Sequence, residues 1–341
     1  MTNIETAVAG VRTGGRALET FRRAQAKAAL TAELEQHFEK TETYEEFRTK
    51  VFDVLALREA QLAMGKSELK GVVMIGPAGS GKSRMVEEIM TEHQELVERD
   101  GGWKFGSRIL SIIVPGRSTV KETMQAILEG LGYSVRSRRD EQYLTNMAMS
   151  LLKKTGVAAV HLDEVQDSGR YKTRDSVEAF LKIFRNMMQH KEWPVCLILT
   201  AKPEAKALIN MDSPLLRRVR PQEICPIEFK TDGPQLKNAL QTLSRKGGVT
   251  DHEILEYDEF IQILIHASAR RFGVAVEIGI MAIVNCRIEG REVLDMGHFA
   301  DAYEERMCVD DELNPFVAEH WSIIDTEKIM QRFDEERNLL R

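Results

Sequence analysis

The chain has 341 residues, of which 43% are hydrophobic and 29% are charged, and its formal net charge is −6. This composition is too apolar for a disordered or collagen-like chain, and no apolar run approaches the roughly 18–20 residues that span a bilayer. The N-terminal segment lacks the apolar stretch of a secretory signal, and the four cysteines and eight histidines lack zinc-site spacings. We therefore expect a cytoplasmic protein of one or two domains, in which any nucleic-acid site is a local basic patch.

The first part of the chain is expected to be helical. Residues 1–60 contain no proline and few glycines, and their apolar residues recur three and four positions apart. The stretch Thr41–Thr43 offers a break and a new helix cap. We therefore predict a helical N-terminal extension over residues 1–43.

Short apolar runs separated by helical patterns follow. The runs predict strands at residues 71–75, 109–114, 157–162, 195–200 and 224–229. The helical patterns between them cover residues 84–93, 120–131, 144–154 and 177–189. Continuous apolar strands that alternate with helices indicate a parallel sheet covered on both faces. The sequence therefore predicts an α/β domain with a five-stranded parallel sheet over residues 44–230, a small helical lid over 231–308 and a tail over 309–341.

A glycine-rich segment follows the first expected strand. It fits the pattern GxxxxGK[ST] and consists of Gly76, Pro77, Ala78, Gly79, Ser80, Gly81, Lys82 and Ser83. Its glycines let backbone N–H groups turn inward around phosphate oxygens, and the next helix adds the positive end of its dipole. Lys82 is expected to reach the β- and γ-phosphates, and the Ser83 hydroxyl to ligate Mg²⁺. The motif therefore predicts binding of ATP or GTP with Mg²⁺.

Two carboxylates follow the third expected strand, which reads Val-Ala-Ala-Val-His-Leu. Asp163 is expected to lie near Mg²⁺, because its strand is predicted beside the phosphate loop. Glu164 is then placed to orient and polarise the water that attacks the γ-phosphate. With the phosphate loop, this pair predicts hydrolysis in addition to binding. A static switch that keeps its nucleotide has little need of Glu164.

Three later positions carry polar groups that suit phosphate chemistry. Thr200 ends the fourth expected strand, where its hydroxyl is predicted either to bond the attacking water or to cap the following turn. Arg217 and Arg218 form either a solvated basic turn or a subunit edge whose arginine stabilises the transferring phosphoryl group of a neighbouring subunit. Arg270 or Arg271, at the start of a lid helix, is predicted either to contact the γ-phosphate as a second sensor or to form a surface ion pair.

The order of these parts resembles that of an AAA+ ATPase, with a P-loop AAA+ core. It runs from the phosphate loop through the Asp-Glu strand, the polar strand end and the arginine turn to a helical lid. More narrowly, residues 45–290 resemble the TniB/TnsC family of transposition regulators, which is related to MuB and initiator-type ATPases. Two segments carry this resemblance: Ile112–Gly132, a strand, proline, threonine and helix ending in Leu-x-x-Leu-Gly, and His161–Gln166. Thr200 stands where many relatives carry asparagine, and residues 269–271 lack the usual Gly-Asn lead-in.

The resemblance implies an ATP-dependent protein that forms rings or helical filaments on duplex DNA, recruits or activates a transposase, and disassembles on hydrolysis. The residues implied to face DNA are Arg117, Ser118, Thr119 and Lys121. Phosphate contacts of this kind give affinity without sequence readout. A second basic loop with Arg136, Arg138 and Arg139 fits either DNA contact or a solvated loop. A targeting complex also fits as a partner, whereas a membrane does not. The alternative function is that of an ATPase that loads a helicase or remodels another protein.

The C-terminal tail contains the aromatic stretch Asn314–Trp321, followed by an acidic helical pattern. Exposed aromatic residues in such a tail suit docking to a partner. The alternative is a terminal segment that packs on its own domain. Both interpretations are open from the sequence.

Overall fold

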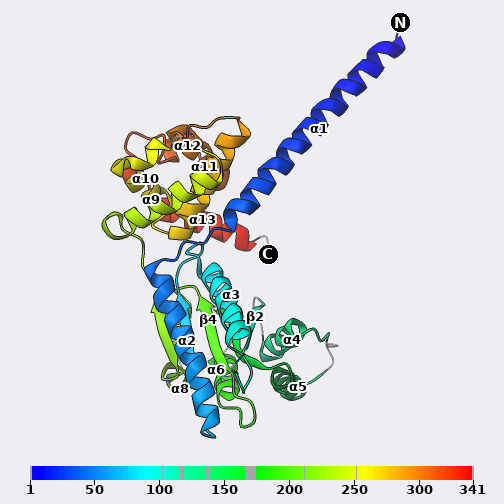
Figure 1. Cartoon of the computed structure of the whole chain (residues 1–341), viewed down its shortest axis with the longest axis vertical. Coiled ribbons are helices and arrows are strands. Elements are labelled where there is room, and N and C mark those ends of the chain that lie inside the picture. The colour runs from blue at the N-terminus through cyan, green and yellow to red at the C-terminus, as the bar shows by residue number, and fades with distance from the viewer. Residues whose placement is uncertain are drawn as a thin grey trace. The chain divides into compact units, whose positions relative to one another are not determined.

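The computed structural model describes residues 2–101, 103–115, 119–134, 139–165, 174–210, 212–250 and 252–339. Side chains are described for these residues except 2–16, 174–177, 179, 208–209 and 333–339. The chain divides into two compact units (Figure 1). One, here called the sheet unit, is Lys40–Cys225; the other, called the helical unit, combines Met1–Glu39 with Pro226–Arg341.

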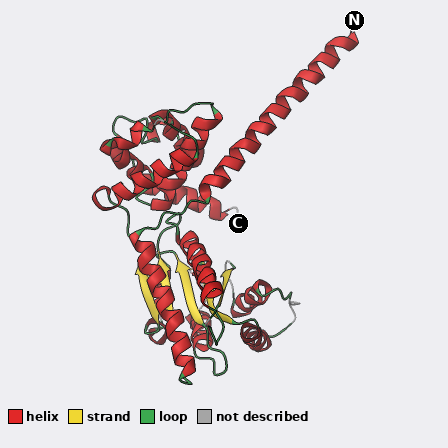
Figure 2. Ribbon diagram, viewed as in Figure 1, coloured by secondary structure: helices red, strands yellow, loops and turns green. Residues whose placement is uncertain are grey.

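A five-stranded parallel sheet forms the centre of the sheet unit (Figure 2). Its strands are β1 (Gly71–Ile75), β2 (Arg108–Ile113), β3 (Val157–Asp163), β4 (Cys196–Ala201) and β5 (Val219–Glu223). Their order is β2-β3-β4-β1-β5, and every neighbouring pair is parallel. Every residue of β1, β3 and β4 is buried, as expected for strands covered on both faces. The predicted α/β fold with a five-stranded parallel sheet is therefore confirmed.

The position predicted for the fifth strand is wrong. Residues 224–228 are not in a strand, and Phe229 begins a helix. The strand is instead Val219–Glu223, which among the described residues pairs with β1 alone and so forms an edge of the sheet. An edge strand needs no continuous apolar run and tolerates Pro221, because one of its sides makes no ladder bonds.

Helices cover the sheet of this unit. They are α2 (Glu42–Ala63), α3 (Lys82–Asp100), α4 (Val120–Gly130), α5 (Glu141–Lys154), α6 (Arg174–Met188), α7 (Ala205–Asn210) and α8 (Ser213–Leu216). Helix α2 packs across β1, β3 and β4, and Figure 1 shows α2 and α3 in front of the strands. Helices α4 and α5 pack on each other and on β2 and β3. The Thr41 side chain accepts a hydrogen bond from the Tyr44 amide and so caps α2.

The helical unit is built from both ends of the chain. Its helices are α1 (Thr2–Glu35), α9 (Phe229–Lys246), α10 (Asp258–Ala267), α11 (Phe272–Ile288), α12 (Met296–Met307) and α13 (Thr326–Leu339), with short 3₁₀ turns η2 (Glu253–Glu256), η3 (Asp311–Leu313) and η4 (Trp321–Ile323). Leu34 of α1 and Met330 of α13 belong to its buried core. Among the described residues, no helix has both the length and the apolar character needed to cross a membrane.

The tail packs against its own unit. The buried Phe316 ring lies 5.8 Å from that of Phe299 and 6.0 Å from that of Tyr303. The Trp321 ring meets the His266 ring edge-on at 5.3 Å. These contacts favour packing over docking for the aromatic residues of this segment.

Candidate nucleotide-binding site

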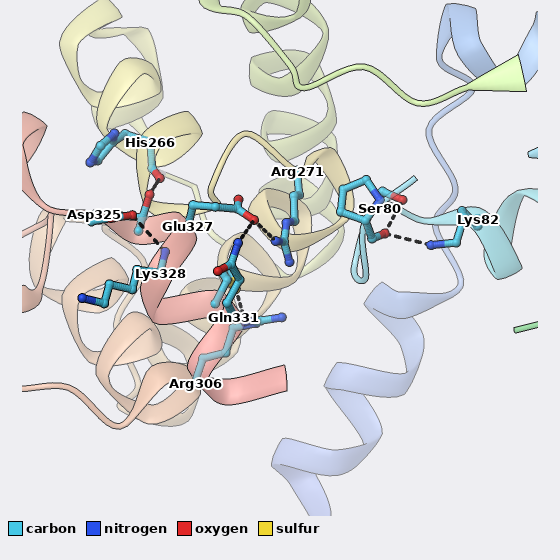
Figure 3. Close-up of polar contacts among 12 residues, drawn as sticks. Ser80, Lys82, His266, Arg271, Arg306, Asp325, Glu327, Lys328 and Gln331 are labelled. Atoms are coloured by element: carbon cyan, nitrogen blue, oxygen red, sulfur yellow. Dashed lines mark hydrogen bonds and ion pairs between the residues drawn. The ribbon is translucent and has the colours of Figure 1, made fainter. Parts of the chain in front are cut away.

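The phosphate loop joins β1 to α3 through a turn whose backbone conformation requires glycine at two positions. Gly79 has φ +72° and Gly81 has φ +91°, both in the left-handed region that L residues rarely adopt. The Ser80 hydroxyl donates to the Pro77 carbonyl at 2.8 Å and closes the loop on itself (Figure 3). The N-cap residue Gly81 supplies no side-chain bond to the start of α3. This arrangement suits an anion at the helix N-terminus.

The Lys82 ammonium is buried above the same loop. Its side chain is 6% exposed, and Nζ donates to the carbonyls of Gly76 and Pro77, each at 2.8 Å. A lysine ammonium carries three protons and accepts nothing, so its natural partners are oxygen atoms such as these carbonyls or a phosphate. The loop therefore holds Lys82 where a bound phosphate would replace carbonyl oxygens as its partner.

Both oxygens of the Asp163 carboxylate accept hydrogen bonds. The Ser83 hydroxyl donates to Oδ2 at 2.6 Å, and the Glu164 backbone N–H donates to Oδ1 at 2.9 Å. The Thr200 hydroxyl also donates to Oδ1. Hydroxyl and carboxylate oxygens are the ligands that Mg²⁺ prefers, so Ser83 and Asp163 fit this metal.

Sheet topology explains how these groups meet. The phosphate loop, Asp163 and Thr200 lie at or just beyond the carboxyl ends of β1, β3 and β4, which lie at one edge of a parallel sheet. In the sheet, β4 lies between β1 and β3. Thr200 of β4 therefore bridges the gap to Asp163. Glu164 follows with φ +60°, an uncommon conformation for a residue other than glycine and one often found at functional sites.

Two further side chains join this cluster, and the sequence did not indicate them as site residues. His161 Nε2 lies 2.9 Å from the Thr200 hydroxyl oxygen, and His161 Nδ1 lies 2.8 Å from that of Ser111. Burial lowers the pKa of His161 to about 4, although the charge of Asp163 opposes this shift. The sequence did offer one indication: side chains two positions apart in a strand lie on the same face, so His161 shares a face of β3 with Asp163.

The two candidate arginines of the turn after α8 differ in their contacts. Arg218 donates to the Pro214 carbonyl at 2.7 Å and to the Glu68 carboxylate at 2.5 Å, and its side chain is 14% exposed. Arg217 is exposed, and among the described residues its side chain makes no hydrogen bond or ion pair. Arg217 is therefore free to serve a group outside this chain.

The lid arginines lie in a turn between α10 and α11. Arg270 has φ +58°; its guanidinium donates to the Ile227 carbonyl at 3.1 Å and to Glu228 at 3.0 Å, and half of its side chain is exposed. Arg271 is 5% exposed and pairs with Glu327 of α13 at 2.8 Å (Figure 3). Within the helical unit, both arginines therefore make ion pairs. Their contact with a γ-phosphate stays a prediction.

The residues implied to face DNA are described in part. Arg117 and Ser118, and Arg136 and Arg138 of the second basic loop, lie outside the described residues. Thr119 caps α4 in a reciprocal box, in which its side chain accepts from the Glu122 amide and the Glu122 carboxylate accepts from the Thr119 amide. Lys121 is half-buried on the first turn of α4. The Arg139 guanidinium stacks over the Tyr143 ring at 4.9 Å.

The fold and the site together define an α/β P-loop core of the AAA+ type. A protein-family model described as an AAA domain matches residues 65–209. This range contains the phosphate loop, Asp163, Glu164 and Thr200. No curated protein is significantly similar to the chain.

Solved structures support the same fold. The ORC1 protein of Aeropyrum pernix, in a complex with DNA, has a TM-score of 0.57 and 16% identity over 79% of this chain and 66% of its own. The ORC2 protein of the same organism, with ADPNP and ADP, has a TM-score of 0.57 and 13% identity over 77% and 68%. Cdc6p of Pyrobaculum aerophilum has a TM-score of 0.55 and 11% identity over 79% and 69%. The match to ORC1 thus spans just under two thirds of that chain, and similarity at these identities establishes the fold.

Proposed function

We propose that the protein is an ATP-dependent DNA-binding regulator of DNA transposition, which assembles on duplex DNA and recruits or activates a transposase. The observation that carries the ATPase part is the bond from the Ser83 hydroxyl to Asp163. It joins the end of the phosphate loop to the acidic end of β3 at 2.6 Å. A glycine turn without nucleotide has no need of such a pair.

The described residues divide the work of hydrolysis among them. Lys82 and the loop amides hold the β- and γ-phosphates, and Ser83 with Asp163 provides oxygen ligands for Mg²⁺. When bound, Mg²⁺ neutralises charge on the phosphates. Glu164 orients a water and accepts its proton as the water oxygen attacks the γ-phosphorus. The bond between that phosphorus and the β–γ bridging oxygen then breaks, which gives ADP and phosphate.

Arg217 is proposed to complete the site of a neighbouring subunit. Its guanidinium is exposed and unengaged within the described residues, whereas Arg218 is tied to Pro214 and Glu68. A planar guanidinium stabilises charge on a transferring phosphoryl group. Hydrolysis would then depend on assembly into a ring or filament.

DNA, a transposase and a targeting complex are the proposed partners. Support for DNA comes from the similarity to the ORC1 structure, which contains DNA, and from Lys121 at the start of α4. Support for transposition comes from the resemblance of residues 112–132 and 161–166 to transposition regulators. Arg117, Ser118, Thr119 and Lys121 are proposed to contact DNA phosphates, which gives affinity that falls steeply with salt.

Electron microscopy of the full chain with duplex DNA tests this proposal. Samples with and without a non-hydrolysable ATP analogue are compared with Glu164→Gln in ATP. Rings or filaments that need both DNA and nucleotide, and that persist in ATP for Glu164→Gln, support the proposal. Nucleotide binding without assembly on DNA overturns it. That result favours an ATPase that loads a helicase or remodels another protein.

A further inference from the structure

A line of hydrogen bonds crosses the sheet and ends at the phosphate loop. It starts at the Ser111 hydroxyl of β2, passes through both ring nitrogens of His161 at 2.8 and 2.9 Å, and reaches the Thr200 hydroxyl of β4. Thr200 bonds Oδ1 of Asp163, whose Oδ2 accepts from Ser83 at 2.6 Å. Five side chains from β2, β3, β4 and α3 are therefore linked in one series.

The protons in this series have one consistent direction. A threonine hydroxyl has a single proton, and that of Thr200 is donated to the carboxylate of Asp163. His161 Nε2 must therefore carry the proton between itself and Thr200. In a neutral imidazole the other nitrogen is an acceptor, so the Ser111 hydroxyl donates to Nδ1. Each group donates toward Asp163, which fixes one histidine tautomer.

The central members of this series are buried among apolar residues, so the loss of one hydrogen bond would leave a buried polar group without a partner. His161 is 3% exposed and Thr200 is fully buried, in strands whose other residues are mostly apolar. Ser111 is the register partner of His161 on the neighbouring strand, so their side chains share a face of the sheet. Because a buried polar group without a partner is destabilising, each member of the series keeps its hydrogen bond, and this favours a single arrangement. The outer end, Ser111, is exposed at the β2 edge.

We propose that His161 and Thr200, anchored by Ser111, are positioning residues that hold the Asp163 carboxylate in its working orientation. Oδ1 is occupied by Thr200 and by the Glu164 amide, so Oδ2 is directed to Ser83 and to the metal that the pair would share. Because the Thr200 proton is already donated to Asp163, it is not available to the attacking water. This inference rests on the proposed function, in which Asp163 and Ser83 hold Mg²⁺.

Binding of a fluorescent ADP analogue, with Mg²⁺ and with EDTA, tests the role without relying on turnover. Outer partners of metal ligands typically contribute about 10–100-fold to metal affinity. Mg²⁺ is expected to tighten ADP binding, and Thr200→Val and His161→Phe should each raise the Mg²⁺ concentration needed for half of this effect by about 10–100-fold. Neither variant should change the ADP affinity measured in EDTA. Thr200→Ser keeps the hydroxyl and should restore the wild-type value. Thr123→Val, which also removes a buried threonine hydroxyl but lies outside the series, is the matched control.

Nitrogen NMR of histidine-labelled protein gives a second readout that does not need nucleotide. The His161 ring, assigned by its loss in His161→Phe, should be the Nε2–H tautomer. Ser111→Ala, at an exposed position, should weaken that preference without unfolding the protein. An Nδ1–H tautomer, or a Thr200→Val variant that keeps its Mg²⁺ dependence and only lowers the hydrolysis rate at saturating Mg²⁺, overturns the inference. If the wild type shows no Mg²⁺-dependent nucleotide binding, the proposed function itself fails.

Discussion

The turns that precede β2 and β3 meet at two glycines, and this contact offers a sharp test of the sheet unit. Gly106 has φ +78°, and a Cβ added there would lie 2.4 Å from the carbonyl oxygen of Gly156. That same oxygen accepts from the Arg108 amide at 3.1 Å, where the pairing of β2 with β3 begins. Gly106→Ala therefore requires two pieces of backbone to separate at the start of the ladder.

The cost has two parts that a control variant separates. Holding an alanine in the left-handed region costs about 1–2 kcal/mol. Forcing a Cβ into occupied space costs about 1–3 kcal/mol more, because backbone yields less readily than a side-chain end. Gly65 has φ +71°, and a Cβ added there would have no atom within 4 Å, so Gly65→Ala carries the first part alone. We expect Gly106→Ala to lose more stability than Gly65→Ala by the second part, about 1–3 kcal/mol.

Thermal unfolding followed by tryptophan fluorescence measures this difference. Trp103 and Trp193 lie in the sheet unit and Trp321 in the helical unit, so a Trp321→Phe background limits the signal to the sheet unit. Each kcal/mol lowers Tm by roughly 2–4 °C for a unit of this size. Equal Tm values for Gly106→Ala and Gly65→Ala would refute the close approach as the cause.

Three further predictions follow from described contacts. Glu164→Gln should lower the ATP hydrolysis rate by roughly 10²–10⁴-fold and keep nucleotide affinity, as measured by phosphate release and by titration with labelled ADP; an unchanged rate contradicts its role as base. The buried Arg58 guanidinium donates to the carbonyls of Pro194 at 3.0 Å and Phe105 at 2.7 Å, so Arg58→Met should destabilise the sheet unit by about 3 kcal/mol in denaturant unfolding, and Arg58→Lys should not fully rescue it. Burial lowers the pKa of His93 below its ordinary value of 6.5, so the unfolded chain takes up this proton at a higher pH than the folded chain. The stability due to neutral His93 is thus present above pH 6.5 and is lost as pH falls toward the lowered pKa; His93→Phe should flatten that slope, and an unchanged slope contradicts the assignment.

The sequence predicted four strands well because β1, β3 and β4 are buried, mostly apolar runs, and because β2, although it lies at an edge, has isoleucine or leucine at four of its six positions. The sequence Val-Arg-Pro-Gln-Glu of β5 has no such run, since an edge strand is covered less and pairs on one side. The insertion of β4 between β1 and β3 is a property of the sheet as a whole, and no local pattern encodes it. The grouping of Met1–Glu39 with Pro226–Arg341 is likewise set by contacts between residues distant in sequence.

The candidate site was predictable where a short motif carries it. The phosphate loop fixes the position of Lys82 and Ser83, and the apolar strand before Asp163 fixes its place at the sheet edge. The bonds of Asp163 to Thr200, and of Thr200 to His161, depend on the strand order and register, which the linear pattern does not contain. His161 was visible only as a polar residue within an apolar strand.

The helical unit has a consequence for how the chain acquires its structure. Leu34 of α1 is fully buried in a core whose other members come from residues 227–330. A chain made from its N-terminus therefore completes the whole of Lys40–Cys225 before Leu34 meets its neighbours. The sheet unit is therefore inserted in the sequence of the helical unit, and it can fold before the helical unit is complete. A fragment that begins at residue 40 would lose part of the core of the other unit, so useful truncations should retain the end of α1.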